Sequence, residues 1–113
     1  MHFSRLLAPL ALATTLISIQ VAAHADAVEN GKAAFVSNGC WQCHGFQGQG
    51  GAGPKLAPDP KPYEFISVFV RHTKGAMPPY SEKILSNDDL ASIYAYLRSV
   101  PKAPDYKTIH ILN

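Results

Sequence analysis

The sequence predicts an all-α fold with three main helices in one small domain. The strongest signal lies near the C-terminus, where apolar residues recur at the i, i+3, i+4 and i+7 spacing of a helix: Leu90, Ile93, Tyr94 and Leu97. Residues 63–72 also place apolar residues on one helical face, without the strict alternation of a strand. The 113 residues, 47% hydrophobic and 16% charged, suit one ordinary globular domain. The net charge of +2, with no basic cluster, argues against a nucleic-acid surface.

Residues 1–25 have the pattern of a cleaved secretory signal peptide. A positively charged start is followed by a mostly apolar run over residues 6–23 and by the small-x-small site Ala23-His24-Ala25. An uncleaved membrane anchor is the alternative, but polar residues interrupt the run, which barely reaches the roughly 18 residues of a spanning helix. We therefore expect export, to the periplasm or a similar compartment.

The first helix of the domain is expected over residues 26–38. Asp26 and Glu29 have the spacing of a capping box, and Gly39 is placed to end the helix just before the cysteines. Gly31 is unusual inside a helix, where glycine costs about 1 kcal/mol relative to alanine. It therefore predicts a close crossing by another helix, with a frayed first turn as the alternative.

The segment Cys40-Trp41-Gln42-Cys43-His44 has the spacing that attaches a haem covalently. On one helical turn Cys40 and Cys43 project from the same side, so both sulfurs can reach the vinyl groups along one porphyrin edge. His44 then serves as the proximal iron ligand. A disulfide would close too short a loop to stabilise much, a zinc site needs four ligands, and a thioredoxin-like pair needs a βαβ unit. We expect one covalent haem c.

Residues 45–61 show no periodicity and are rich in glycine and proline, which predicts a loop wrapped around the haem edge. Glycine lets the backbone approach a flat ligand closely. Pro54 keeps a carbonyl that can accept the second ring N–H of His44 and fix its tautomer. A mobile surface loop is the alternative.

Two more helices follow. Pro62 suits the first position of a helix over residues 63–72. The apolar face of that helix comprises Phe65, Ile66, Phe69 and Val70. Ser86 and Asp89 form a capping box ahead of the last helix, and Pro101 stops it.

Met77 lies in a proline-rich turn, residues 75–79, that cannot be regular structure. Because Met1 leaves with the signal, a thioether ligand of the iron has to be Met77. The other role for Met77 would be filling a gap in the core. His72 is the rival distal ligand, and His110 is a weaker one.

Together these residues resemble a small class I cytochrome c, over the whole segment after the signal. The matching features are Gly31 and Phe35, the motif from Cys40 to His44, Gly53-Pro54-Lys55-Leu56, Met77-Pro78 and Tyr96-Leu97. The resemblance implies that the first and last helices cross near the glycine and aromatic positions. It also implies that Pro54 accepts a hydrogen bond from His44 and that Met77 is the distal ligand. The middle of the chain is shorter than in the best-known members, so the groups that hold the haem propionates stay unassigned.

The expected function is one-electron transfer by an iron that cycles between Fe(II) and Fe(III), with no enzyme activity. Methionine opposite histidine raises the reduction potential, which suits a carrier from a dehydrogenase towards a terminal oxidase. One alternative is a cytochrome subunit bound permanently to a flavin, quinone or molybdenum dehydrogenase. Others are a gas-binding or catalytic haem protein with a displaceable distal ligand, and a structural exported domain with an empty motif. The expected partners are redox proteins, with no nucleic acid and no stable membrane insertion after signal cleavage.

Four lysines in the predicted loops would rim the haem edge and steer an acidic partner: Lys55, Lys61, Lys74 and Lys83. Scattered solubilising charge is the alternative. The domain is expected to end at residue 100, and residues 101–113 form a proline-broken tail with apolar side chains at Tyr106, Ile109, Ile111 and Leu112. These would be covered either by the domain itself, as a strap across its helices, or by a partner.

Overall fold

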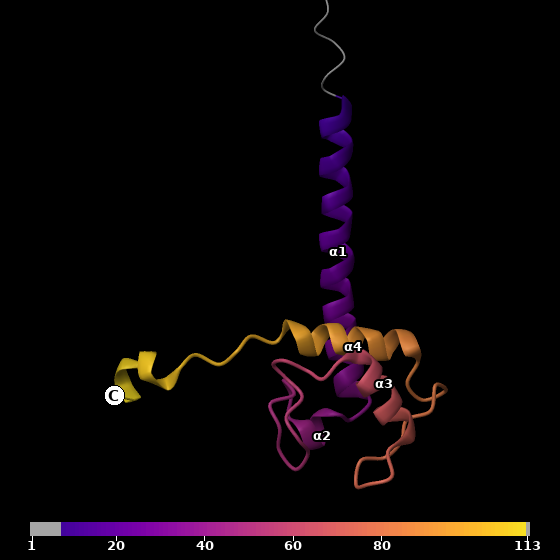
Figure 1. Cartoon of the computed structure of the whole chain (residues 1–113), viewed down its shortest axis with the longest axis vertical. Coiled ribbons are helices and arrows are strands. Elements are labelled where there is room, and N and C mark those ends of the chain that lie inside the picture. The colour runs from indigo at the N-terminus through magenta and orange to yellow at the C-terminus, as the bar shows by residue number, and fades with distance from the viewer. Residues whose placement is uncertain (1–7, 113) are drawn as a thin grey trace, which may run out of the picture.

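The structure is a computed structural model of the chain and describes residues 8–112. Its helices are α1 (Ala8–Ser37), α2 (Trp41–His44), α3 (Tyr63–His72) and α4 (Asn87–Ser99), followed by the short 3₁₀ turns η1 (Tyr106–Thr108) and η2 (His110–Leu112). Residues 8–112 contain no strand, so the predicted all-α class is confirmed. Figure 1 shows the C-terminal part of α1 crossing α4, with α2, α3 and the connecting loops gathered below the crossing.

The crossing of α1 and α4 explains Gly31. A Cβ atom at this position would overlap the carbonyl oxygen of Ser92 in α4, so only glycine allows the two backbones to meet. One turn later Phe35 packs against Tyr96, with ring centroids 5.8 Å apart and planes inclined by 56°. The predicted helix crossing is confirmed, and the frayed first turn is wrong.

The core surrounds this crossing. Its largest fully buried side chains come from α1, from α4 and from the loop before α4: Phe35, Leu85, Leu90 and Leu97. Within α4 the predicted stripe is right except at Tyr94, which is half-buried and packs against Tyr63 at 5.5 Å, while Tyr96 is 7% exposed. Tyr96 faces the core because it follows Ile93 by three positions, on the side of α4 that meets Phe35.

The ends of α3 and α4 follow the expected residues. Ser86 Oγ accepts a hydrogen bond from the backbone N–H of Asp89 at 3.0 Å, so Ser86 caps α4 as predicted. The Asp89 carboxylate accepts from the Ser86 hydroxyl at 2.8 Å and not from the Ser86 backbone N–H, so the second half of the predicted capping box differs. α4 ends at Ser99, two residues before Pro101. Pro62 lies at the N-cap of α3, one position before the helix begins at Tyr63, and not at the predicted first helical position.

The apolar face predicted for α3 is partly wrong. α3 packs on the core through Val70, which is buried, and through Ile66 and Tyr63, which are partly buried. Phe65 and Phe69 lie off this face and stack on each other at 5.9 Å, with 55% and 46% of their surface exposed. The positions that meet the core follow an i, i+3, i+7 spacing, which leaves the two phenylalanines on another side of the helix.

The start of the first helix also differs from the prediction. α1 begins at Ala8, so Asp26 lies inside the helix and caps nothing in the full chain. The alanine- and leucine-rich residues before Asp26 favour helix and continue it upstream. The charged start of the predicted signal, residues 1–5, lies outside the described residues. Within residues 8–112, no helix combines the length and apolarity needed to cross a membrane.

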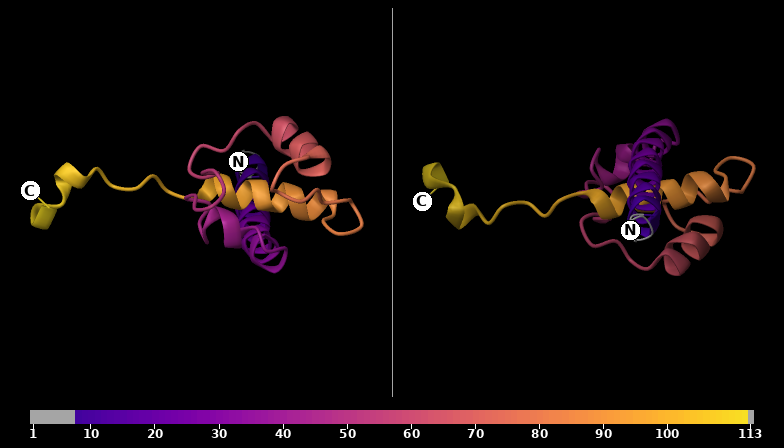
Figure 2. Two further views of the ribbon diagram at one scale, coloured as in Figure 1. Left: turned by 90° about the horizontal axis from the view of Figure 1, so that it is seen from below. Right: turned by 90° about the horizontal axis from the view of Figure 1, so that it is seen from above.

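The C-terminal tail leads away from the helices in all three views (Figures 1 and 2). Ile111 is 90% exposed and Tyr106 is 61% exposed, so the predicted strap across the domain is wrong. The radius of gyration is 20.0 Å, against about 13 Å for a compact chain of this length, because α1 and the tail both project. One ion pair, Lys102 to Asp59 at 3.1 Å, joins the start of the tail to the domain, and both side chains are largely exposed.

Candidate haem-binding site

The end of α1 sets the position of the first cysteine. Gly39 adopts a left-handed conformation, with φ of 76°. Its N–H donates to the carbonyl of Val36 at 3.0 Å, and the N–H of Cys40 donates to the carbonyl of Phe35 at 3.1 Å. This pair of bonds is the Schellman motif that terminates a helix at glycine. The predicted role of Gly39 is confirmed, and Cys40 is placed directly against the buried Phe35 turn.

The two thiols share one helical turn. The N–H of His44 donates to the carbonyl of Cys40 at 3.0 Å, and the N–H of Gly45 donates to that of Trp41 at 2.8 Å. Cys40 is half-buried, Cys43 is exposed, and neither is in a disulfide. Burial raises the pKa of the Cys40 thiol above its ordinary value, so this thiol is protonated at neutral pH. Two free thiols three positions apart thus lie on one side of α2.

His44 is held in a single orientation. Its side chain is 7% exposed, and Nδ1 lies 2.7 Å from the carbonyl oxygen of Pro54. A carbonyl can only accept, so Nδ1 carries the proton and donates it. The lone pair of Nε2 is then left free for a metal.

The loop over residues 45–61 packs against the motif. Gly53 donates its N–H to the carbonyl of Cys43 at 2.8 Å, and Gly50 donates to that of His44 at 2.8 Å. A Cβ atom at Gly53 would lie 2.8 Å from Cε1 of the His44 ring, closer than a side chain tolerates. These contacts favour the predicted loop wrapped around the site and argue against a mobile surface loop. They also require glycine at position 53.

Met77 lies between α3 and α4, half-buried and packed against the core cluster. The rival histidines are both exposed, His72 at the end of α3 and His110 in the tail. Across residues 8–112, no three histidine, cysteine, aspartate or glutamate side chains gather closely enough to hold a metal ion.

Tyr80 stands near both cysteines. Burial raises the pKa of its hydroxyl, and charge on Cys40 and Cys43 adds to the increase. The hydroxyl donates to the carbonyl of Asn38 at 2.9 Å. The sequence does not predict this role of Tyr80, because nothing in the pattern around residue 80 points to a partner 42 positions away.

An aromatic pair joins the motif to the loop that follows it, and the sequence patterns did not predict it. The rings of Trp41 and Phe46 stack at 4.4 Å with planes inclined by 12°, and Phe46 is 57% exposed. Tyr96 fixes this arrangement, since its hydroxyl donates to the carbonyl of Phe46 at 2.8 Å. One aromatic residue inside the motif and one just after it were the available signal.

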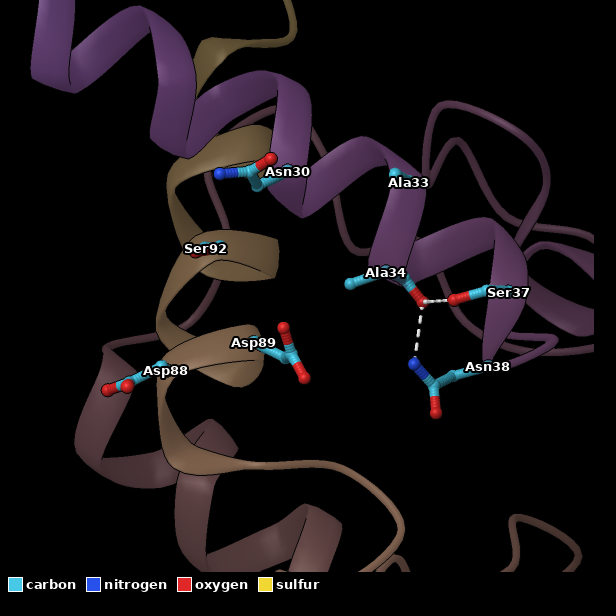
Figure 3. Close-up of a pocket in the computed structure, with 8 residues that line it drawn as sticks. All are labelled: Asn30, Ala33, Ala34, Ser37, Asn38, Asp88, Asp89 and Ser92. Atoms are coloured by element: carbon cyan, nitrogen blue, oxygen red, sulfur yellow. Dashed lines mark hydrogen bonds between the residues drawn. The ribbon is translucent and has the colours of Figure 1, made fainter.

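A polar groove of about 470 Å³ lies elsewhere, between the end of α1 and the start of α4. Figure 3 shows it lined by small and polar side chains, with Asp88 and Asp89 at one side and with Ser37 and Asn38 bonded to the carbonyl of Ala34. It contains none of the cysteine, histidine or methionine residues assigned above to the haem.

The residues of the site fit a haem. The groups available to a haem are an oriented imidazole with a free Nε2 and a half-buried thioether, and two unpaired thiols precede the imidazole on the same turn. The absence of a side chain at Gly53 lets the backbone pack directly against the imidazole ring, where a Cβ atom would overlap it. A histidine–methionine pair is an established axial set for a cytochrome c iron.

The fold and this donor set define a c-type cytochrome. Residues 26–97 match the family model for cytochrome c oxidase, cbb3-type, subunit III, and the chain belongs to that family. The protein is therefore an electron carrier based on haem c, not an enzyme, and it exchanges electrons with redox partner proteins. No curated protein and no solved structure gives a significant match.

Proposed function

We propose that the protein binds one haem c covalently through Cys40 and Cys43, with His44 and Met77 as axial ligands. The observation that carries this proposal is the 2.7 Å contact between His44 Nδ1 and the Pro54 carbonyl, directly after two free thiols on one turn. It leaves Nε2 as the ligand atom and keeps the ring from turning.

A bound haem supplies an iron that alternates between Fe(II) and Fe(III). The residues of this chain would limit the iron to this one-electron exchange. The Nδ1–H of His44 donates to the carbonyl of Pro54, which would hold the imidazole in one orientation toward a bound iron. The thioether of Met77 would serve as the second iron ligand, which would raise the potential and leave no position on the iron for a substrate.

The direction of transfer that we propose is from a dehydrogenase towards a terminal oxidase, in an exported compartment. The raised potential of a histidine–methionine iron supports this direction. The family description names a subunit of a terminal oxidase, which supports an oxidase as the acceptor. The four loop lysines are all exposed, as a steering role for an acidic partner requires.

The tail favours a second candidate, a cytochrome subunit bound permanently to a dehydrogenase. Tyr106 and Ile111 are exposed to solvent instead of covering the domain, and Pro101 and Pro104 stiffen the connection. Burying two or three such side chains contributes about 1.5 to 3 kcal/mol each to a partner interface. Truncation after Lys102 should leave the melting temperature of the isolated cytochrome unchanged but weaken co-purification of the dehydrogenase. Unchanged co-purification would remove this candidate.

Two measurements on the holoprotein test the proposed function. Haem should remain with the polypeptide through acid-acetone extraction and denaturing electrophoresis, since thioethers survive both. The ferrous protein should bind carbon monoxide only slowly at neutral pH, because Met77 occupies the iron. Rapid binding would contradict the carrier function and favour a gas-binding or catalytic haem protein.

A further inference from the structure

We propose that Tyr80 is a positioning residue: it ties the loop that carries Met77 to the turn that carries the two cysteines, and with Arg71 it keeps external ligands off the iron. The inference rests on the proposed function, in which Met77 is the distal ligand. It adds the residues that hold Met77 in place.

The loop between α3 and α4 has few ways to be held. Pro78 and Pro79 follow Met77 directly, and neither has a backbone N–H to donate. The next N–H belongs to Tyr80, and it donates to the carbonyl of Val70 at 2.9 Å. Tyr80 is thus the first residue after Met77 whose backbone is fastened to a helix.

Arg71 fastens the same residue from another direction. Its Nη1 donates to the carbonyl of Tyr80 at 2.9 Å, and its Nη2 donates to Oδ1 of Asn87 at 2.9 Å. One guanidinium therefore joins the last turn of α3, the Met77 loop and the first residue of α4. Hydrogen bonds from an ionised donor are stronger than neutral ones, and the fork geometry fixes direction as well as distance.

The hydroxyl of Tyr80 makes the third connection. It donates to the carbonyl of Asn38 at 2.9 Å, two residues before Cys40. Carbonyls at the end of a helix lack intrahelical partners, so this acceptor is available at the end of α1. The Asn38 side chain is itself bonded to the carbonyl of Ala34 at 2.9 Å (Figure 3), which keeps the acceptor in place.

These bonds join both sides of the site through one side chain. Met77 is three residues from Tyr80, and both intervening residues are proline, so displacing Met77 far from the iron would strain or break the Tyr80 contacts. A neutral hydrogen bond of this kind changes an equilibrium roughly fivefold to tenfold. Removing one should make opening of the loop, and entry of an external ligand, more favourable by that factor.

The test is imidazole binding to the ferric holoprotein and carbon monoxide binding to the ferrous holoprotein. Tyr80→Phe keeps the ring and removes only the bond to Asn38, and it should raise the imidazole affinity roughly fivefold to tenfold. Tyr96→Phe is the matched control, because it removes a bond of 2.8 Å to the Phe46 carbonyl that does not touch the Met77 loop. Both variants should lose similar thermal stability, but only Tyr80→Phe should change ligand binding.

A second variant, Arg71→Gln, removes the contacts to Tyr80 and Asn87 and should raise imidazole affinity at least as much. The positioning role is overturned if the wild type resists both ligands and Tyr80→Phe and Arg71→Gln resist them equally well. It is also overturned if Tyr96→Phe opens the site as much as Tyr80→Phe. If the wild type itself binds both ligands readily, the proposed ligation by Met77 fails first, and the positioning role fails with it.

Discussion

The two sides of the proposed haem site are built in different ways. On the His44 side the contacts are short in sequence, since Pro54 and Gly53 lie about ten residues from the histidine and the cysteine that they touch. On the Met77 side, Tyr80 reaches Asn38 across 42 positions and Arg71 reaches Asn87 across 16. The direct contacts of His44 and Cys43 are thus local backbone contacts, with the bond from Tyr96 to the Phe46 carbonyl beside them, whereas the Met77 side depends on a few tertiary hydrogen bonds.

This difference predicts where the site is sensitive. The His44 side should respond most to substitutions that block backbone approach, such as a Cβ atom on glycine. The Met77 side should respond most to the loss of single hydrogen-bonding side chains. The predictions that follow probe the local side first and then the surface.

The largest effect is expected from replacing both Cys40 and Cys43 with alanine. Covalent haem should be lost, and the apoprotein should be largely unfolded, because a small domain depends on the apolar plate that the haem adds to its core. Circular dichroism and denaturing electrophoresis measure both effects. A well-folded variant without haem would show that the helix crossing alone sustains the fold.

Gly53→Ala should have the next largest effect, since the added Cβ atom would lie 2.8 Å from the His44 ring. We expect a loss of about 1 to 3 kcal/mol in the free energy of unfolding, as for other overpacked sites. Gly75→Ala is the control, because nothing lies within 4 Å of a Cβ atom there, and it should stay within about 0.5 kcal/mol. Equal losses in urea denaturation would contradict the close packing of the His44 side.

The loop lysines should have a moderate effect on rate. The fourfold variant replaces Lys55, Lys61, Lys74 and Lys83 with glutamine. Oxidation of its ferrous form by anionic hexacyanoferrate should be about tenfold slower than that of wild type at low salt, and the difference should vanish at high salt. Lys32→Gln, on α1, is the control. If the fourfold variant reacts as fast as wild type at low salt, these lysines serve only solubility.

The smallest effect concerns alkaline pH. Burial raises the pKa of Tyr96 above its ordinary value of 10.0, so the fold favours the neutral phenol. The stability from this preference is fully present below the ordinary pKa and is lost as the pH rises through the raised one. Tyr96→Phe should therefore show a shallower fall in melting temperature above about pH 9 than wild type. If the melting temperatures of both proteins fall with the same slope, another group is the source of the alkaline destabilisation.

How much the sequence alone could predict follows the same division. The sequence spacing predicts that a helix ends at Gly39 and that another begins after Ser86. The steric needs of glycine likewise predict the close packing at Gly31. By contrast, the Tyr80 bond to Asn38 joins segments with no common pattern, so only the fold brings them together.

Two other features also lay beyond the sequence patterns. The upstream extension of α1 depends on whether the residues before Asp26 are retained, which a cap signal cannot decide. The direction of the tail is set by the path after Pro101, and apolar side chains in a tail do not reveal which surface covers them.

The central claim is that Met77 is the distal ligand, and the near-infrared spectrum of the ferric holoprotein tests it most directly. A thioether bound to ferric haem gives a weak sulfur-to-iron charge-transfer band. We predict that wild type shows this band and that Met77→Ala loses it, together with a fall in reduction potential. A band that persists in Met77→Ala, or that is absent from wild type, would contradict the account.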